Sequence, residues 1–186
     1  VQTIGGGPAA GLCGSGILDT LAQLLMAGVI DPRGSLLQHP RVRSDGGIRE
    51  FVLVEGHDDH RAITFTQKDI RELQLAKGAM RTGIEVLLKN HGLGADEIDQ
   101  VIIAGAFGTY IDVSSAIAVG MLPRLPLDRF RQVGNAAGMG ARLALISRSK
   151  RVEAQDLARR VRYIELASDP GFNHTFAGAM RLEAKP

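Results

Sequence analysis

Two glycines follow an apolar run at a place where a ligand could reach bare backbone. Residues 101–104 have the composition of a strand, and the sequence then breaks at a four-residue turn before a small-residue segment, 114–119, expected to be helix or coil. Because glycine has no Cβ atom, the N–H groups of such a turn can face a ligand at close range. The candidate binding residues are Gly105, Ala106, Phe107 and Gly108. A tight strand-to-helix turn without a ligand is the alternative.

A second glycine-rich loop, Gly11-Leu12-Cys13-Gly14-Ser15-Gly16, precedes a predicted helix. Phosphate groups bind well to the free N–H groups at a helix N-terminus, so Gly14, Ser15 and Gly16 form a candidate phosphate-approach loop. A P-loop is excluded because no lysine follows the glycines. A helix N-terminus can lower the pKa of a thiol such as Cys13. No histidine lies within 25 residues of it, and we expect a small buried thiol rather than a nucleophile.

Metal-competent side chains gather in one short loop, His57-Asp58-Asp59-His60. Four adjacent ligands are sterically poor for a single ion, so we expect a solvated hairpin tip, and the roles of His57 and His60 stay open. The chain has one cysteine and no zinc-ribbon or ferredoxin spacing. The sequence therefore indicates neither a metal site nor a catalytic side chain.

The clearest predicted element is a long amphipathic helix over residues 67–90. Thr66 can cap the N–H of Asp69, and Asp69 places a carboxylate in the first turn. Apolar residues then recur every three or four positions, which predicts one buried face. They are Ile70, Leu73, Ala76, Met80, Ile84 and Leu87. Gly78 and Gly83 lie inside this helix and indicate close backbone packing or ligand approach.

Strands and helices alternate along the rest of the chain. The predicted helices are 15–27, 136–149, 152–161 and 169–180, and the predicted strands are 48–54, 62–65, 101–104, 130–133 and 163–166. Residues 38–47 are predicted to be a loop. This alternation places the protein in the α/β class.

Bulk composition is that of a globular protein with one core. The chain has 186 residues, is 45% hydrophobic and carries a net charge of +2, with its basic residues scattered. This pattern favours neither a nucleic-acid partner nor a membrane partner. No apolar run reaches the roughly 20 residues of a spanning helix, and the single cysteine suits a reducing compartment, so a cytoplasmic location is predicted.

Four stretches together resemble one protein family. Residues 11–16, 66–79, 105–108 and 134–141, in this order and spacing, look like the C-terminal half of the ATPase domain in the reductive activators of corrinoid proteins. That domain is similar to the actin, sugar-kinase and heat-shock-protein ATPase superfamily. The resemblance implies a ribonuclease H-like, actin-like ATPase lobe with a mixed sheet flanked by helices. Residues 1–186 would form a single C-terminal lobe with a sublobe at 48–92, and the upstream ferredoxin-type domain and first ATPase lobe are expected to be absent.

The resemblance also implies roles for individual residues. The glycine turn 105–108 would hold the adenosine end of ATP, and Asn135 would hold an adjacent loop, although helix capping is an equal alternative. Lys77, with Glu72 and Arg81, could line the place where the base or ribose packs. A solvated charged face is the alternative for these three residues.

The function implied by the resemblance is an ATP-dependent activator that returns inactive Co(II) corrinoid proteins to Co(I). ATP with Mg²⁺ would be the ligand, an iron–sulfur cluster would lie only in the upstream part, and the partner would be a corrinoid methyl-transfer protein. A homodimer is an open expectation. This chain alone is expected to bind nucleotide or dock, without redox chemistry or hydrolysis.

Two other functions remain open at this stage. One is a non-catalytic dimerisation or protein-docking module with a degenerate nucleotide site. The other is a small-molecule kinase of the same superfamily.

Overall fold

The computed structural model describes residues 3–57 and 60–183. Its α-helices are α1 (Gly14–Met26), α2 (Gln67–His91), α3 (Ala106–Tyr110), α4 (Val113–Ala118), α5 (Ala136–Ile146), α6 (Arg148–Arg160) and α7 (Phe172–Ala179). Its strands are β1 (Val42–Asp45), β2 (Ile48–Val54), β3 (Ile63–Thr66), β4 (Val101–Ala104) and β5 (Phe130–Gly134). Short 3-10 turns lie at Ile4–Gly6, Ala95–Glu97, Leu127–Arg129 and Leu166–Ser168.

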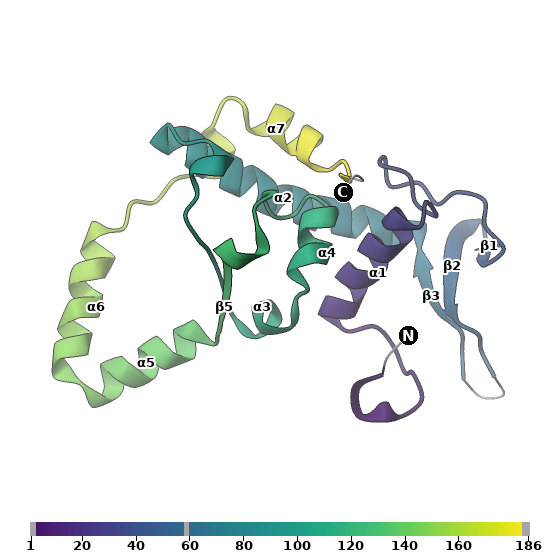
Figure 1. The fold of residues 1–186 in the computed structure, drawn as a ribbon, viewed down its shortest axis with the longest axis horizontal. Coiled ribbons are helices and arrows are strands. Elements are labelled where there is room, and N and C mark those ends of the chain that lie inside the picture. Colours follow the sequence, from purple (N-terminus) through teal and green to yellow (C-terminus); the bar gives the residue numbers. More distant parts are fainter. Residues whose placement is uncertain (1–2, 58–59, 184–186) are drawn as a thin grey trace.

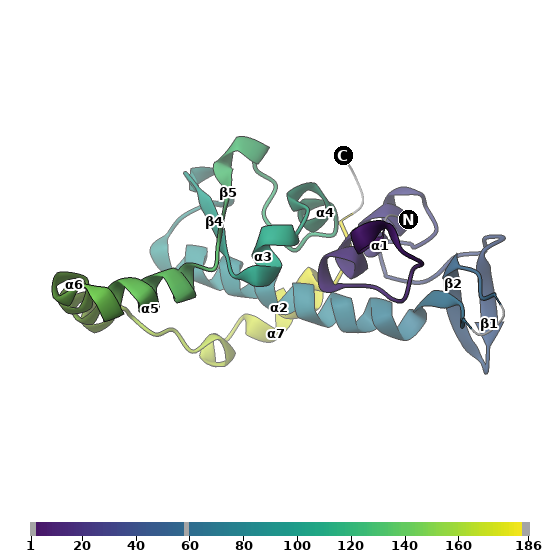
Figure 2. The same ribbon diagram turned by 90° about the horizontal axis from the view of Figure 1, so that it is seen from below.

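The strands form two sheets, the antiparallel one at one end of the molecule and the parallel pair between it and helices α5 and α6 (Figure 1). Strands β1, β2 and β3 make an antiparallel sheet in that order, with an irregularity in the β2–β3 register near Val52. Strands β4 and β5 make a parallel pair. Helix α2 runs lengthwise between these two regions (Figure 2). The predicted α/β class is confirmed, with antiparallel and parallel pairing in separate sheets.

Helix α2 begins and ends where its sequence predicts. The Thr66 hydroxyl accepts a hydrogen bond from the Asp69 N–H at 3.1 Å, and the Thr66 N–H donates to Asp69 Oδ2 at 2.8 Å. This reciprocal capping box satisfies two N–H groups that would otherwise be unpaired. The helix ends at Gly92, whose φ of 66° is left-handed and favours glycine.

One hydrophobic core joins α1, the antiparallel sheet, α2 and α4. Fully buried side chains from these elements and the loops between them include Leu21, Ile30, Leu36, Phe65, Ile70 and Val119. Helix α7 lies along α2, as both views show (Figures 1 and 2). Burying these side chains stabilises the fold by roughly 1.5–3 kcal/mol each. The α1–α2 region is therefore the stable frame that positions the loops around it.

The segment after α7 is fastened across α2 and the loop before β1. The Gln74 amide donates to the carbonyls of Arg33 and Met180 at 3.1 and 3.0 Å. The Leu182 N–H donates to the Pro32 carbonyl at 2.9 Å. Hydrogen bonds to main-chain carbonyls, from the Gln74 side chain and the Leu182 N–H, thus hold segments together that are far apart in the sequence.

Several sequence predictions differ from the structure. Residues 42–45 form β1 rather than loop, because they pair with β2 across the two-glycine turn Gly46-Gly47. The predicted strand 163–166 is wrong, since the structure shows a coil and a 3-10 turn there. The predicted helix 136–149 ends at Ile146, because Ser147 is extended and its hydroxyl caps α6.

Helices α5 and α6 form a hairpin that projects from the parallel strands (Figure 1). Neither helix contains a buried residue. Leu145 and Ile146 at their junction are each more than 70% exposed. Within residues 3–57 and 60–183, no helix has the length and apolarity required to cross a bilayer.

Candidate functional site

Two of the predicted binding loops meet in space although they are about 90 residues apart in sequence. The start of α1 packs against α3, and a Cβ atom added to Gly14 would lie only 2.9 Å from Cε2 of Phe107. Glycine at position 14 therefore permits this approach of helix to ring. The structure brings together Gly14, Ser15 and Gly16 with Ala106 and Phe107.

The junction of these loops opens into the main pocket, a cavity of about 1500 Å³. It is lined by the N-terminal segment, one face of α1, the exposed side of α3 and the ends of β2 and β3. The side chains that line it include Cys13, Asp19, Thr20, Gln23, Phe107 and Tyr110. Its volume is sufficient for a nucleotide-sized ligand, because drug-sized ligands occupy pockets of about 300–1000 Å³.

Cys13 organises the first turn of α1. Its sulfur accepts a hydrogen bond from the Gly16 N–H at 3.4 Å and lies 3.4 Å from the Ser15 hydroxyl. The Ser15 hydroxyl, followed by the Gly16 N–H, lowers the pKa of the Cys13 thiol, because both hydrogen bonds favour the thiolate. The thiol is exposed, so the expectation of a buried thiol is wrong.

The predicted glycine turn is in fact one glycine followed by a short helix. Gly105 has a φ of 103°, a conformation that L-residues with a Cβ rarely adopt, and α3 begins at the next residue. The Gly105 N–H donates to the Gly134 carbonyl at 2.7 Å. This bond ties the ends of β4 and β5 together and directs α3 toward α1.

Gly108 is buried on the side of α3 that faces β4 and is not among the residues that line the pocket. A Cβ atom at this position would lie 2.7 Å from Cγ2 of Ile103 on β4. The Gln132 amide of β5 then donates to the Gly108 and Ile111 carbonyls at 2.7 and 2.9 Å. Gly108 therefore allows α3 to pack on β4, and this packing holds Ala106 and Phe107 at the pocket.

Asn135 acts as the cap of α5. Its side-chain oxygen accepts a hydrogen bond from the Gly138 N–H at 2.9 Å. It follows Gly134, which lies beside Gly105, but Asn135 is not among the residues that line the main pocket. The capping alternative for Asn135 is present in the structure, and contact with a ligand stays a prediction.

Comparison with known proteins defines the family. Residues 1–185 match the family model described as the C-terminal domain of RACo, the ASKHA domain. The chain belongs to this family. The predicted actin-like ATPase fold and the resemblance to corrinoid activators are thereby confirmed.

Named relatives of this RACo C-terminal domain extend well beyond it. The corrinoid activation enzyme RamQ of Eubacterium limosum is 38% identical over 178 residues, which are 89% of this chain and 30% of that protein. The Co(II) methylated amine-specific corrinoid protein reductase of Methanosarcina barkeri is 24% identical over 175 residues, 90% of this chain and 28% of that protein.

A solved structure of a reductive activator for a corrinoid, iron–sulfur protein has the same fold as this RACo C-terminal domain. The two superpose with a TM-score of 0.90 at 38% identity, covering 98% of this chain and 30% of the other. The chain therefore spans about 30% of the length of the relatives described here.

Lys77 of this RACo C-terminal domain lies apart from the other predicted site residues. Its side chain is 3% exposed, and its ammonium group donates to the Arg181 carbonyl. Burial lowers the pKa of Lys77 to about 8. Arg81, predicted to lie near it, pairs with Glu85 at 2.7 Å. Lys77 is not among the main-pocket residues, and its role toward a nucleotide stays a prediction.

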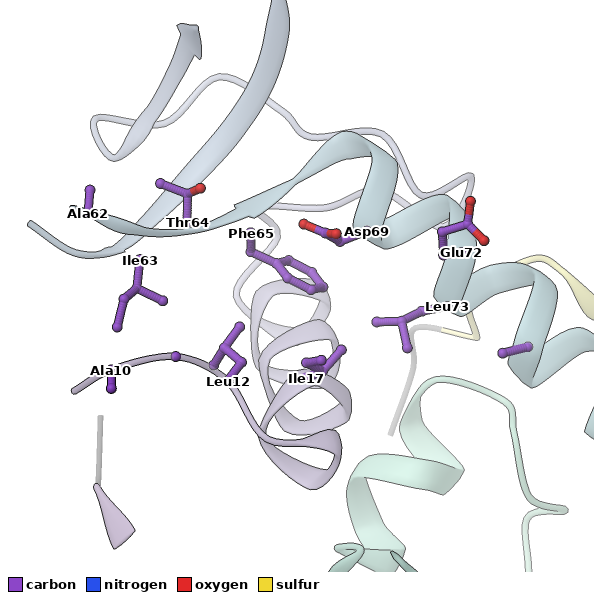
Figure 3. Close-up of a pocket in the computed structure, with 12 residues that line it drawn as sticks. Ala10, Leu12, Ile17, Ala62, Ile63, Thr64, Phe65, Asp69, Glu72 and Leu73 are labelled. Atoms are coloured by element: carbon purple, nitrogen blue, oxygen red, sulfur yellow. The ribbon is translucent and has the colours of Figure 1, made fainter.

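A second groove of about 740 Å³ adjoins the main pocket and shares Gly11, Leu12 and Ile63 with it. Figure 3 shows Leu12, Ile17, Ile63 and Leu73 around one space, with Asp69 and Glu72 at its α2 side. Asp69 is occupied by the capping box, and neither residues 14–16 nor α3 line this groove, whereas both line the main pocket. We therefore assign the polar ligand to the main pocket.

His57 and His60 face each other across the hairpin tip. Each main-chain N–H donates to the other residue's carbonyl, at 3.1 and 2.8 Å. Asp58 and Asp59 lie outside the described residues. Among residues 3–57 and 60–183, no cluster of three or more metal-ligating side chains is present.

Sequence reasoning missed the polar face of α1. Gly16, Asp19, Thr20 and Gln23 all line the main pocket. Their spacing of three, one and three residues places them on one side of a helix. The sequence contains this spacing, but only the position of α3 opposite this face of α1 shows that the face lines a pocket.

Proposed function

We propose that this chain binds ATP with Mg²⁺ in the main pocket and serves as the nucleotide-binding and docking part of a corrinoid activator. The observation that supports it best is the meeting of the α1 N-terminus with α3. Two loops whose backbone suits a nucleotide line one cavity, in a domain of the ASKHA family.

The start of α1 suits the phosphate end. The helix is 13 residues long, and its first N–H groups have no helical acceptor. The Gly16 N–H donates to Cys13 Sγ, and the other N–H groups of the first turn, together with the helix dipole, attract an anion. Residues with small or no side chains, Gly14, Ser15 and Gly16, leave this end open to approach. These residues would orient the phosphates without supplying a charged side chain.

The exposed side of α3 suits the adenosine end. Phe107 and Tyr110 are 49% and 75% exposed and line the pocket, so their rings offer apolar surface to a base. Among the described lining residues there is no lysine or arginine. Mg²⁺ bound to the nucleotide would supply the positive charge that a triphosphate requires.

The activity proposed for the whole protein is the reduction of a partner's cobalt. Inactive Co(II) would gain one electron from an iron–sulfur cluster held elsewhere in the whole protein and become Co(I), and nucleotide binding or hydrolysis would drive this unfavourable step. The named relatives act on corrinoid proteins, which supports this assignment. This chain has one cysteine, so an iron–sulfur cluster of the [2Fe–2S] or [4Fe–4S] type would be held elsewhere in the protein.

A docking role is favoured by the α5–α6 hairpin. Apolar side chains of both helices, including Leu145, Ile146 and Leu157, are exposed on it. The Arg151 guanidinium donates to the Leu145 carbonyl at 3.4 Å, and Arg160 follows Leu157 by three positions on α6. We propose that a corrinoid methyl-transfer protein docks here, and this role does not require an occupied nucleotide pocket.

Calorimetric titration of ATP with Mg²⁺ into the protein tests the nucleotide proposal. We expect Gly16→Val to weaken binding by roughly tenfold or more, because its side chain would occupy the space at the start of α1. A Cβ atom there has only ordinary contacts, 3.4 Å to Cys13 Sγ and 3.8 Å to Leu12, and circular dichroism of the variant checks that its fold is retained.

The matched control is Gly140→Val, a glycine within exposed α5 where a Cβ atom would have no neighbour within 4 Å. It should bind ATP as the unmodified protein does. Equal ATP affinity of Gly16→Val and Gly140→Val would contradict the placement of the nucleotide at the start of α1. If the corrinoid proposal holds, Gly16→Val should also slow ATP-dependent formation of Co(I), followed by visible absorption.

A further inference from the structure

The free edge of strand β3 forms one wall of the second groove. In the part of the chain that the structure describes, β3 pairs with β2 on one side and with no strand on the other. Four consecutive residues, 62–65, line the groove. Because side chains alternate between the two faces of a strand, a groove over one face would be lined by every second residue only. The groove therefore runs along the edge of β3, where main-chain N–H and C=O groups are open to pairing.

Helix α2 forms the opposite wall of this groove. Asp69, Glu72, Leu73 and Ala76 line it, and their spacing of three, one and three residues places them on one face of the helix. A strand edge beside a helix face suits an extended peptide, because the peptide can pair with the strand through its main chain and place alternate side chains in the groove.

The walls define the chemistry of the ligand. Leu12, Ile63 and Leu73 point into the space between strand and helix (Figure 3), so they offer contacts to apolar side chains. A purely apolar ligand would remove the edge of β3 from water without pairing its main-chain groups, which costs free energy. A peptide backbone supplies both donors and acceptors. At about 3.3 Å per residue, the four residues of this edge match roughly four residues of an added strand.

The groove is acidic on its α2 side. Of the described residues that line it, only Asp69 and Glu72 are charged. Glu72 is exposed, and none of the ion pairs within that part of the chain includes it. The neighbouring guanidinium of Arg71 is engaged elsewhere, since it donates to the Arg33 carbonyl at 3.1 Å. A lysine or arginine of the bound peptide would complement this charge.

We propose that the groove between β3 and α2 binds an extended, basic segment of a separate partner protein, which adds to β3 as a fourth strand of the antiparallel sheet. Its alternate apolar side chains enter the groove, and a basic side chain meets Glu72. A second copy of this chain fits less well, because a two-fold contact would bring the same acidic surface from both copies together. The site does not depend on nucleotide binding in the main pocket.

The test titrates three labelled peptides of about six residues into the protein, followed by fluorescence anisotropy. The first alternates valine with lysine, the second alternates valine with glutamate, and the third is the first with every main-chain nitrogen methylated. We expect the second and third to bind at least about tenfold more weakly than the first. Glutamate is repelled by Glu72, and methylation removes the donors that pair with β3.

Two results with these peptides would overturn the inference. One is the absence of binding by the valine–lysine peptide. The other is equal binding of its methylated form, which would show that the groove accepts apolar groups without strand pairing. If sedimentation shows that the protein associates with itself and that the peptide disrupts this association, a second copy occupies the edge and the inference is likewise wrong.

The Glu72→Lys variant assigns the charge recognition to this side chain. It should weaken binding of the valine–lysine peptide by about tenfold and strengthen binding of the valine–glutamate peptide. Glu153→Lys, at an exposed carboxylate on α6, makes the same change of charge away from the groove and should leave both affinities unchanged. Equal peptide affinities of the two variants would contradict the role of Glu72.

Discussion

Lys77 is the charged residue whose environment has the clearest energetic consequence. Its ammonium group is buried beneath the segment after α7, where it meets the Arg181 carbonyl. Burial is the main cause of its lowered pKa, Glu183 and Glu85 oppose the lowering, and Arg81 adds to it. The folded state therefore disfavours the charged form that the unfolded chain retains.

The stability of the protein should depend on pH through Lys77. The pKa of Lys77 falls from 10.5 to about 8 on folding. Below pH 8 both the folded and the unfolded states carry the proton, and the folded state then bears the full free-energy cost of burying the charged ammonium group. Between about pH 8 and 10.5 the unfolded state binds more protons, and stability rises with pH. The total rise should be on the order of 3 kcal/mol.

The Lys77→Met variant isolates this contribution. It cannot titrate, so the free energy of unfolding of the unmodified protein minus that of the variant should increase across this pH range. Urea denaturation at several pH values measures it. A difference that stays constant with pH would contradict the lowered pKa of Lys77.

At the scale of elements, α2 shows which sequence signals determine structure. The capping box at Thr66 and the glycine at position 92 are local signals, and they set both ends of the helix within one residue of the prediction. Strand β4 was also predicted at its observed bounds. Strand β1 was missed because its pairing with β2, and not its own composition, makes it a strand.

The two glycines within α2 should respond oppositely to alanine. A Cβ atom at Gly78 would lie 3.1 Å from Met180 Cγ and 3.4 Å from the Met180 N atom, so Gly78→Ala should push the segment after α7 away and destabilise the protein. At Gly83 a Cβ atom would lie 3.5 Å from Leu166, an ordinary contact. Gly83→Ala should therefore stabilise the helix by up to about 1 kcal/mol.

Thermal unfolding followed by circular dichroism compares these two variants. The unmodified protein should have a Tm between that of Gly78→Ala and that of Gly83→Ala. If both alanines raise the Tm equally, the contact between α2 and the Met180 segment does not limit packing at Gly78.

For the whole molecule, the main pocket depends on contacts that no local pattern predicts. Sequence motifs identified the loops at Gly14–Gly16 and at 105–108 separately. Their meeting requires α1 and α3 to pack, and the resulting pocket is not lined by Gly105, Gly108, Asn135 or Lys77. The face of α1 with Asp19 was missed for the same reason. Tertiary packing thus selected which of the predicted residues share one cavity.

The central claim is that nucleotide binds where α1 meets α3, and amide NMR with ATP and Mg²⁺ tests it most directly. We expect the largest shifts at Ser15, Gly16 and Ala106, with the amides of α6 unchanged. Unchanged signals at these three residues under saturating ATP, or shifts centred instead on Glu72, Leu73 and Ala76 of the second groove, would contradict the account.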